Sequence, residues 1–268
     1  MANRIEIAQP ASSHVLARVD GWPIHLGDLD ATLAHIIERS QVGIGFTVFT
    51  LNLDHLVKLR TTPAFAAAYR TADLVTADGA PVAWLSRFQT KSIRRTTGAD
   101  LFVPLASAAA RHDLPVYLFG STMGVLTATA DALRAKTAGE IAIAGLASPS
   151  ATFDPEGGEA DLAIERIKAS GARLVFVALG APKQEVFAAR AVAQGCTAGF
   201  ICIGAAVDFV AGAQVRAPLV FQRYGLEWAW RLGNNPRRLA KRYALCASVL
   251  FDVAVVAPVR QQFAGREI

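Results

Sequence analysis

Between residues 46 and 210 the sequence alternates short apolar runs with longer amphipathic segments. The apolar runs are rich in Val, Ile, Leu and Phe and have the length of strands, whereas the longer segments place apolar residues at helical spacing. The expected strands span 46–52, 73–78, 114–121, 140–148, 172–180 and the first part of 197–210. The expected helices span 53–72 (with a break near Pro63), 98–113, 122–136, 159–171 and 182–193. This alternation is typical of a parallel sheet that helices cover on both faces.

We therefore expect an α/β protein with a Rossmann-like, mostly parallel sheet. The chain has 268 residues, of which 53% are hydrophobic and 18% are charged, so a large core is possible. Its three cysteines form no CxxC pair, which argues against a disulfide framework or a zinc site and is typical of a reducing cytoplasm. The first residues lack the apolar centre of a secretory signal, and no apolar stretch reaches the roughly 20 residues of a membrane span.

The positive charge is concentrated at the end of the chain. Residues 213–268 hold nine Arg or Lys and three acidic residues, a net charge of +6, which leaves −1 for residues 1–212. We predict an α/β body over 1–212 and a basic, helical, membrane-associating appendage over 213–268. A basic segment indicates an anionic partner, which could be nucleic acid, a membrane surface or a phosphorylated substrate.

Polar residues follow the expected strands. In such sheets ligands bind outside the carboxyl ends of the strands, so these residues should converge on one crevice. The set comprises Thr50, Asn52, Asp78, Gly120, Ser121, residues 180–185 and Asp208. Asp78 is either a turn residue or a base aimed into the crevice. Asn52 or Asp54 could instead cap the following helix, and His55 is expected on that helix's surface.

Two loops are candidates for ligand binding. The sequence GSTMG, residues 120–124, follows a strand and opens a helix, so it is either a phosphate cradle or a tight turn. The sequence ALGAPKQE, residues 178–185, places Pro182 in a first helical turn and Lys183 and Gln184 at the mouth of a strand. We expect Gln184 to face a ligand, since an amide can donate to a phosphate or a sugar hydroxyl. The alternative is a solvated first turn.

The appendage contains RYGLEWAWRLGNNPRRLAKRY, residues 223–243. Asn235 is expected to cap a new helix that begins at Pro236. That helix is basic first and apolar afterwards, with Trp and Tyr nearby, which suits a membrane interface. The alternative is a solvated charged face on an ordinary terminal helix.

Eight motifs occur in one order: TLN, ADLVTADGAP, RTTGAD, LFGSTMGV, GAPKQE, IGAAVDFVAG, RAP and GLEWAWRLGNNPRR. As an ordered set over residues 19–243 they resemble the WecG/TagA/CpsF family of bacterial glycosyltransferases. The resemblance implies sugar transfer from a UDP-sugar to a polyprenyl-diphosphate-linked sugar at the cytoplasmic face of the cell membrane. It also implies inversion at the anomeric carbon, no metal and no other cofactor.

The resemblance assigns roles to individual residues. Asp78 corresponds to the proposed general base, and Thr50 and Asn52 correspond to strand-end residues suited to the donor sugar, Thr50 with a catalytic role. The candidate substrate-binding residues are Asn52, Gly79, Gly120, Gly180, Lys183, Gln184, Asp208, Arg216, Arg223, Arg231, Arg237 and Arg238. The appendage arginines among them are expected to meet the acceptor diphosphate. The turn after Asp78 reads Gly79-Ala80-Pro81, whereas many members have a second glycine two positions after the first, at the place of Pro81, and this difference would reshape the acceptor side.

Two other functions are open to the sequence. A Rossmann-type oxidoreductase would need GxGxxG after the first strand and an acidic residue ending the second, and neither is present in that arrangement. A nucleic-acid-binding module could use the basic appendage, but its interleaved Trp, Leu and Val favour lipid. For the transferase, the candidate donors are UDP-glucose and UDP-N-acetylmannosamine, with hexosyl transfer in exopolysaccharide assembly preferred. A homo-oligomer is possible.

Overall fold

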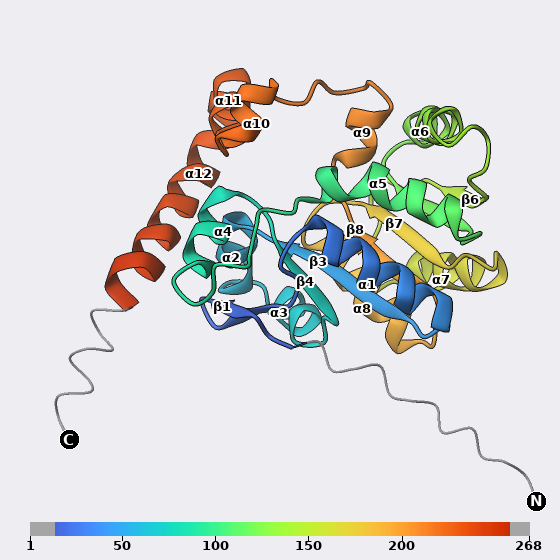
Figure 1. Ribbon diagram of the computed structural model, residues 1–268, viewed down its shortest axis with the longest axis horizontal. Coiled ribbons are helices and arrows are strands. Elements are labelled where there is room, and N and C mark those ends of the chain that lie inside the picture. Colours follow the sequence, from blue (N-terminus) through green and yellow to red (C-terminus); the bar gives the residue numbers. More distant parts are fainter. Residues whose placement is uncertain (1–13, 258–268) are drawn as a thin grey trace, which may run out of the picture.

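The computed structural model describes residues 14–257 and contains one six-stranded sheet (Figure 1). The strand order is β4-β3-β8-β7-β5-β6, and every neighbouring pair is parallel. The strands are β3 (Phe46–Leu51), β4 (Leu74–Ala77), β5 (Val116–Gly120), β6 (Ile143–Ala147), β7 (Leu174–Ala178) and β8 (Gly199–Cys202). The expected parallel, Rossmann-like sheet is confirmed.

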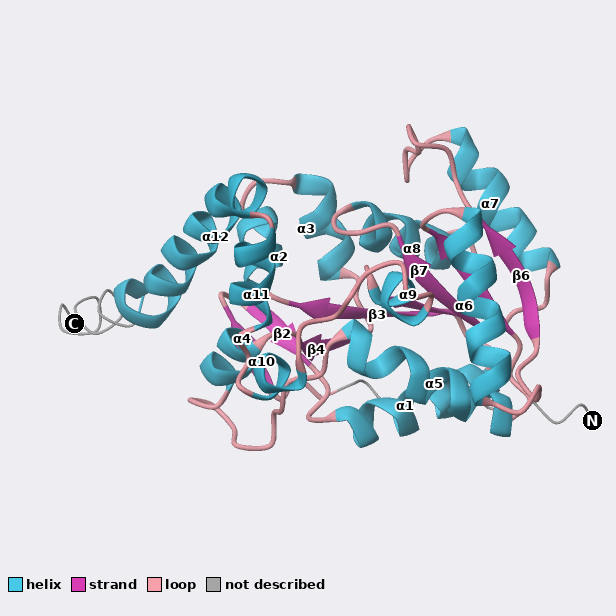
Figure 2. Cartoon of the chain, turned by 90° about the horizontal axis from the view of Figure 1, so that it is seen from above, coloured by secondary structure: helices cyan, strands magenta, loops and turns pink. Residues whose placement is uncertain are grey.

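Helices cover both faces of the sheet (Figure 2). One face packs against α1 (Leu29–Val42), α5 (Gly98–Arg111), α6 (Met123–Lys136) and α9 (Ala206–Val210). The other packs against α2 (Leu53–Leu59), α3 (Pro63–Arg70), α4 (Ala80–Ser86), α7 (Gly158–Ala169) and α8 (Lys183–Ala193). Successive strand residues alternate between the two cores: Phe46 and Val48 belong to the first, Phe49 and Leu51 to the second. Both faces are apolar because both are buried.

The start of the chain holds elements that precede the first expected strand. An antiparallel pair, β1 (Ala17–Val19) and β2 (Trp22–Ile24), is followed by α1, which Asp28 caps through a bond from the Ala31 amide. Val19 and Ile24 are buried in the same core as α4. These strands have three residues each, too short for a periodic signal.

Of three expected helix starts, two agree with the structure and one does not. Asn52 does cap α2, since its side chain accepts a bond from the His55 amide. Pro182 does not begin α8 but occupies the position before it. The break near Pro63 is confirmed, because α2 ends at Leu59 and α3 begins at Pro63.

The segment after residue 212 folds into α10 (Leu219–Arg223), α11 (Glu227–Asn234), α12 (Pro236–Phe251) and the π-helical turn η1 (Asp252–Val256). Pro236 begins α12 as expected, although the Asn235 side chain makes no capping bond. The long helix α12 lies against α2 and buries Cys246 and Val249. Ion pairs of Arg242 with Asp54 and of Asp252 with Arg60 join it to the body.

Part of the apolar surface that was expected to face a membrane is therefore packed on the body of the protein. Within the described range, 14–257, no helix combines the length and the apolar character that crossing a membrane requires. The domain boundary at residue 212 stays a prediction.

Candidate active site

The carboxyl ends of the six parallel strands lie on one edge of the sheet and carry most of the expected site residues. Asn52 directly follows β3, Asp78 follows β4 and Ser121 follows β5. Gly180 and Gly204 lie in the loops after β7 and β8. The structure therefore places on one edge residues that are more than 100 positions apart in sequence.

Asp78 is held in place by the neighbouring strand. Its backbone N–H donates to the carbonyl of Leu51 at 2.8 Å, and the Asn52 amide donates to its Oδ2 at 3.4 Å. Because the Asn52 side chain also caps α2, the amide that faces Asp78 has little rotational freedom. Burial raises the pKa of Asp78 to about 6, against the opposing effects of the Asn52 hydrogen bond and the Arg231 charge. A carboxylate that titrates near neutral pH is suited to act as a base.

Thr50 lies inside β3 and is buried. It pairs across the sheet with Thr76 of β4, whose hydroxyl donates to the carbonyl of Thr96 at 2.9 Å. Thr50 and Asn52 are two positions apart in an extended chain, so they point to the same side of the sheet. The catalytic role of Thr50 stays a prediction.

Gln184 links the loops after β7 and β8. Its Oε1 accepts bonds from the amides of Gly180 and Gly204, each at 3.2 Å, and its Nε2 donates to Glu185 at 2.8 Å. Gln184 is only 3% exposed, and Glu185 is fully buried, so the solvated first turn is excluded. The expected contact between Gln184 and a ligand stays a prediction, because the bonds described here all go to protein groups.

His55 is buried, and its expected place on the helix surface is wrong. It is 5% exposed, and its Nδ1 shares a 2.7 Å hydrogen bond with the hydroxyl of Tyr69. Its Nε2 is 4.0 Å from Oε1 of Glu185. Burial and the Lys58 charge lower the pKa of His55 to about 3, so it is neutral at physiological pH.

Glu185 is an unusual buried acid. Burial raises its pKa to about 7, although the Gln184 hydrogen bond favours the ionised form. Its second oxygen, Oε2, has no hydrogen-bond partner among the described residues. The sequence placed Glu185 at the strand mouth but carried no signal for the buried chain of hydrogen bonds that it joins.

Three other expected site residues, Lys183, Asp208 and Gly120, contact neighbouring parts of the protein. The Lys183 ammonium donates to the carbonyl of Phe153 at 2.7 Å. Asp208 accepts from the Ser121 hydroxyl at 3.1 Å and from the Gln214 amide at 3.0 Å, which joins the β5 loop to the start of the appendage. Gly120 has φ +114°, and a Cβ there would meet the backbone of Ala178, so the site requires glycine.

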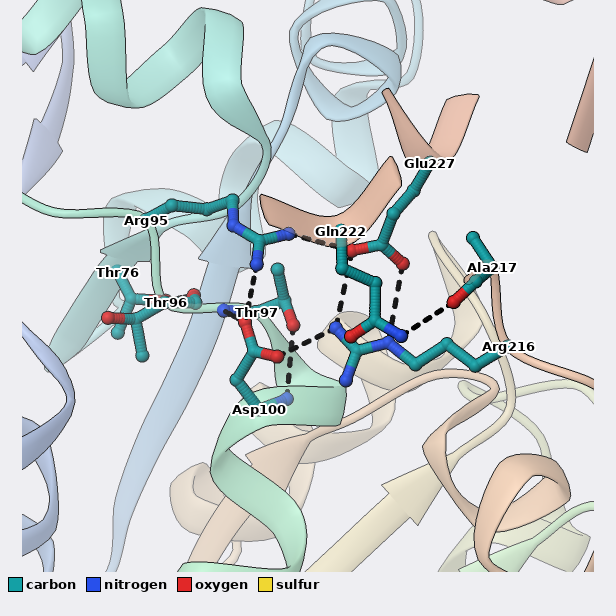
Figure 3. Close-up of polar contacts among 9 residues, drawn as sticks. All are labelled: Thr76, Arg95, Thr96, Thr97, Asp100, Arg216, Ala217, Gln222 and Glu227. Carbon is teal, nitrogen blue, oxygen red and sulfur yellow. Dashed lines mark hydrogen bonds and ion pairs between the residues drawn. The ribbon is translucent and has the colours of Figure 1, made fainter. Parts of the chain in front are cut away.

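Four charged residues join the body to the appendage (Figure 3). Arg216 pairs with Asp100 at 2.7 Å and with Glu227 at 3.2 Å, and Arg95 pairs with Glu227 at 2.7 Å and with Asp100 at 3.5 Å. We call this set, Arg95, Asp100, Arg216 and Glu227, the ion-pair cluster. Burial alone would raise the pKa of Glu227, but hydrogen bonds from Arg216 and Arg95 hold it below its ordinary value.

Sequence reasoning found only Arg216 of this cluster. Arg95 and Asp100 are the first and last residues of the RTTGAD motif, but the motif by itself assigned no role to either charge. Asp100 also completes the capping box of α5 with Thr97. In this structure Arg216, a candidate for the acceptor diphosphate, is paired with two carboxylates.

The other candidate arginines are distributed around the same region. Arg231 lies over the ring of Phe209 at 5.9 Å, and its charge reaches Asp78. Arg223 lines a cavity of about 320 Å³ between α4 and the appendage. Arg237 is exposed on the first turn of α12, and the side chain of Arg238 lies outside the described part of the structure.

The site's chemistry is that of carboxylate, amide, glycine and arginine groups. Over residues 14–257 no three His, Cys, Asp or Glu side chains gather as a candidate metal-ligand set. The arrangement offers a base at the carboxyl edge of a parallel sheet, with arginines beside it for an anionic substrate.

Comparison with known families agrees with this arrangement. The sequence profile described as "Glycosyl transferase WecG/TagA/CpsF family" matches residues 17–264, which is most of the chain. The match spans the sheet, the edge that carries Asp78 and the appendage helices. The chain therefore belongs to the WecG/TagA/CpsF family of glycosyl transferases.

Proposed function

We propose that this glycosyltransferase moves a hexose or an N-acetylhexosamine from a UDP-sugar to a polyprenyl-diphosphate-linked sugar, with inversion. Membership of the family makes the chain a transferase of surface polysaccharide synthesis and removes the oxidoreductase alternative. The observation that supports the proposed chemistry is Asp78, a carboxylate at a strand end with a pKa near neutrality.

In the proposed reaction Asp78 takes the proton from the acceptor hydroxyl as its oxygen attacks the anomeric carbon. The new C–O bond forms on one face of the sugar while the bond to UDP breaks on the other, so the configuration inverts. Asp78 then releases the proton to solvent. Asn52 orients the carboxylate, and Thr50 and Asn52 are suited to hold hydroxyls of the donor sugar.

The departing UDP gains negative charge, and we propose that this charge is met without a metal. Ser121 and Thr122 connect the carboxyl end of β5 to the fourteen-residue helix α6, whose amino terminus therefore lies at the carboxyl edge of the sheet. Arg231 is close enough to Asp78 to affect its pKa, so it is the appendage arginine best suited to an anion at this edge. Arg223, Arg237 and Arg238 are proposed for the acceptor diphosphate or for anionic lipid.

The test is transfer by Asp78→Asn, measured with UDP-glucose and UDP-N-acetylmannosamine and a short-chain lipid-diphosphate-sugar acceptor. Loss of a general base lowers turnover by about 10²–10⁴-fold, whereas UDP binding should change little. Asp131→Asn, on the exposed surface of α6, is the matched control. Turnover by Asp78→Asn near the wild-type rate would show that another group is the base.

A further inference from the structure

The outer face of α4, the turn after it and the adjoining α10 expose aromatic and basic side chains, of which only Arg223 has been given a role above. Trp84 is 50% exposed and Phe88 is 72% exposed, and their rings pack edge to face at 4.9 Å. Trp84 lies in α4, and Phe88 lies in the turn that follows the end of the helix at Ser86, so the ring contact joins the helix to this turn. The opposite side of α4 buries Val82 and Leu85 in the core.

The appendage continues this surface. Arg223 of α10 and Tyr224, which follows it, line the same cavity of about 320 Å³ as Trp84 of α4 and Arg87, the residue after α4. Tyr224 is 70% exposed, and Val220 is exposed one turn earlier. Figure 2 shows α4 and α10 side by side at the same end of the molecule. We name Trp84, Arg87, Phe88, Val220, Arg223 and Tyr224 the α4–α10 surface.

The charge of this region has one sign. Residues 79–99 contain four cations, Arg87, Lys91, Arg94 and Arg95, and no acidic residue. Arg87, Lys91 and Arg94 are exposed. Arg95, which also lines the cavity, pairs with Asp100 and Glu227 in the ion-pair cluster.

Exposed Trp, Tyr and Phe beside Arg and Lys are the composition of segments that lie at a membrane–water interface. Part of the apolar surface of α12, by contrast, is packed on α2. We infer that the α4–α10 surface is a docking surface for an anionic lipid bilayer. The inference rests on the proposed function, because a lipid-linked acceptor must be reached at a membrane.

The position of α4 gives this docking a consequence for the reaction. The helix begins two residues after Asp78, so its outer face and the base belong to one short segment. A bilayer seated on Trp84 and Phe88 would present acceptor headgroups beside the cavity that Arg87 and Arg223 line. Gly225 approaches Ala80 so closely that a Cβ at 225 would meet the Ala80 methyl, so the end of α10 lies directly against the start of α4 and a glycine is needed there.

Binding of the full-length chain to vesicles without acceptor tests the inference separately from transfer. Vesicles of phosphatidylcholine alone and of phosphatidylcholine with phosphatidylglycerol are sedimented with the protein. Trp84→Ser/Phe88→Ser should weaken binding to the mixed vesicles at least tenfold. Arg87→Glu/Lys91→Glu should remove the preference for anionic vesicles. The affinity for the mixed vesicles should fall by about fivefold for each cation lost, and by more because each charge is reversed. Val42→Ser/Ile44→Ser, exposed at the amino ends of the strands, should bind as the wild type.

A second measurement does not depend on substituted variants folding well. Vesicles with brominated lipid should quench the fluorescence of Trp84, and the conservative Trp84→Phe should lose that component of quenching while still binding. Unchanged vesicle binding by Trp84→Ser/Phe88→Ser, with no Trp84 quenching, overturns the inference. A second outcome also overturns it: light scattering shows that the double substitution dissociates an oligomer, and vesicle binding stays intact. In that case the surface joins subunits and does not bind lipid. Failure of all transfer with intact vesicle docking would count against the proposed function alone.

Discussion

Replacing the proposed base should make the protein more stable while removing its activity. The pKa of Asp78 is raised from an ordinary 3.8 to about 6, chiefly by burial. Each unit of difference between folded and unfolded states corresponds to about 1.4 kcal/mol. The ionised carboxylate therefore lowers the free energy of unfolding by up to about 3 kcal/mol, and by about 1–3 kcal/mol if its partial exposure to solvent is allowed for.

The sign of the pH dependence follows from proton binding. Between about pH 4 and pH 6 the folded protein binds more protons at Asp78 than the unfolded chain does, so stability is lost as pH rises through this window. Asp78→Asn has the shape of the side chain without the charge. We expect it to exceed the wild type by about 1–3 kcal/mol at pH 7.5 and to match it at pH 4.

Urea unfolding of both proteins at the two pH values measures the difference, with Asp131→Asn as the control. The same pKa predicts that kcat/KM of the wild type rises with pH to a plateau, with a midpoint of about 6, because the base must be ionised. A protein that is merely damaged loses stability and activity together. The reasoning is refuted if Asp78→Asn is less stable than the wild type at pH 7.5, or if its advantage is the same at pH 4.

Three further predictions concern the cluster, the loops and the donor. Glu227→Gln should lower the local stability of α10 and α11 by about 2 kcal/mol, because it weakens the charge-assisted bonds that Glu227 accepts from Arg95 and Arg216. Hydrogen exchange in these helices should rise about 30-fold, with Glu140→Gln as the control, and unchanged exchange would show that the ion-pair cluster does not hold them. Gln184→Ala should lower the free energy of unfolding by about 1–3 kcal/mol, since it removes the buried acceptor of two partly buried glycine amides. A loss under about 0.5 kcal/mol in urea unfolding would count against this. Transfer should survive EDTA, whereas a strict Mn²⁺ requirement would exclude charge neutralisation by Arg and helix N-termini.

The sheet and its functional edge could be predicted from the sequence because their signals are local. Each strand is a short apolar run, each helix has its own periodicity, and a parallel sheet brings the carboxyl ends of its strands to one edge. For this reason the sequence alone predicts Asn52, Asp78 and Gly180 on one edge. The order of the strands, which places β8 between β3 and β7, has no counterpart in any local pattern.

Burial of single polar residues depended on the tertiary structure. A histidine on a short helix was expected at the surface, but Phe65 and Tyr69 of α3 and Glu185 of α8 enclose His55 from other elements. Likewise, Gln184 was expected to face a ligand. Its oxygen accepts hydrogen bonds from the amides of Gly180 and Gly204, which lie in the loops after β7 and β8, and no local pattern predicts these bonds. Periodicity along one helix does not reveal what packs on each of its faces.

The relation between body and appendage was also decided in three dimensions. The sequence by itself determined a parallel α/β sheet, a carboxylate at a strand end and a basic terminal segment. It did not determine that Arg95 and Glu227, 132 positions apart, form an ion pair, or that Arg216 reaches Asp100 across 116 positions. Nor did it show that α12 packs part of its apolar side on α2, or that aromatic residues at α4 and α10 are exposed. Such pairings arise because folding brings distant segments together, and the energy of an ion pair depends on that distance and on burial, which local sequence does not specify.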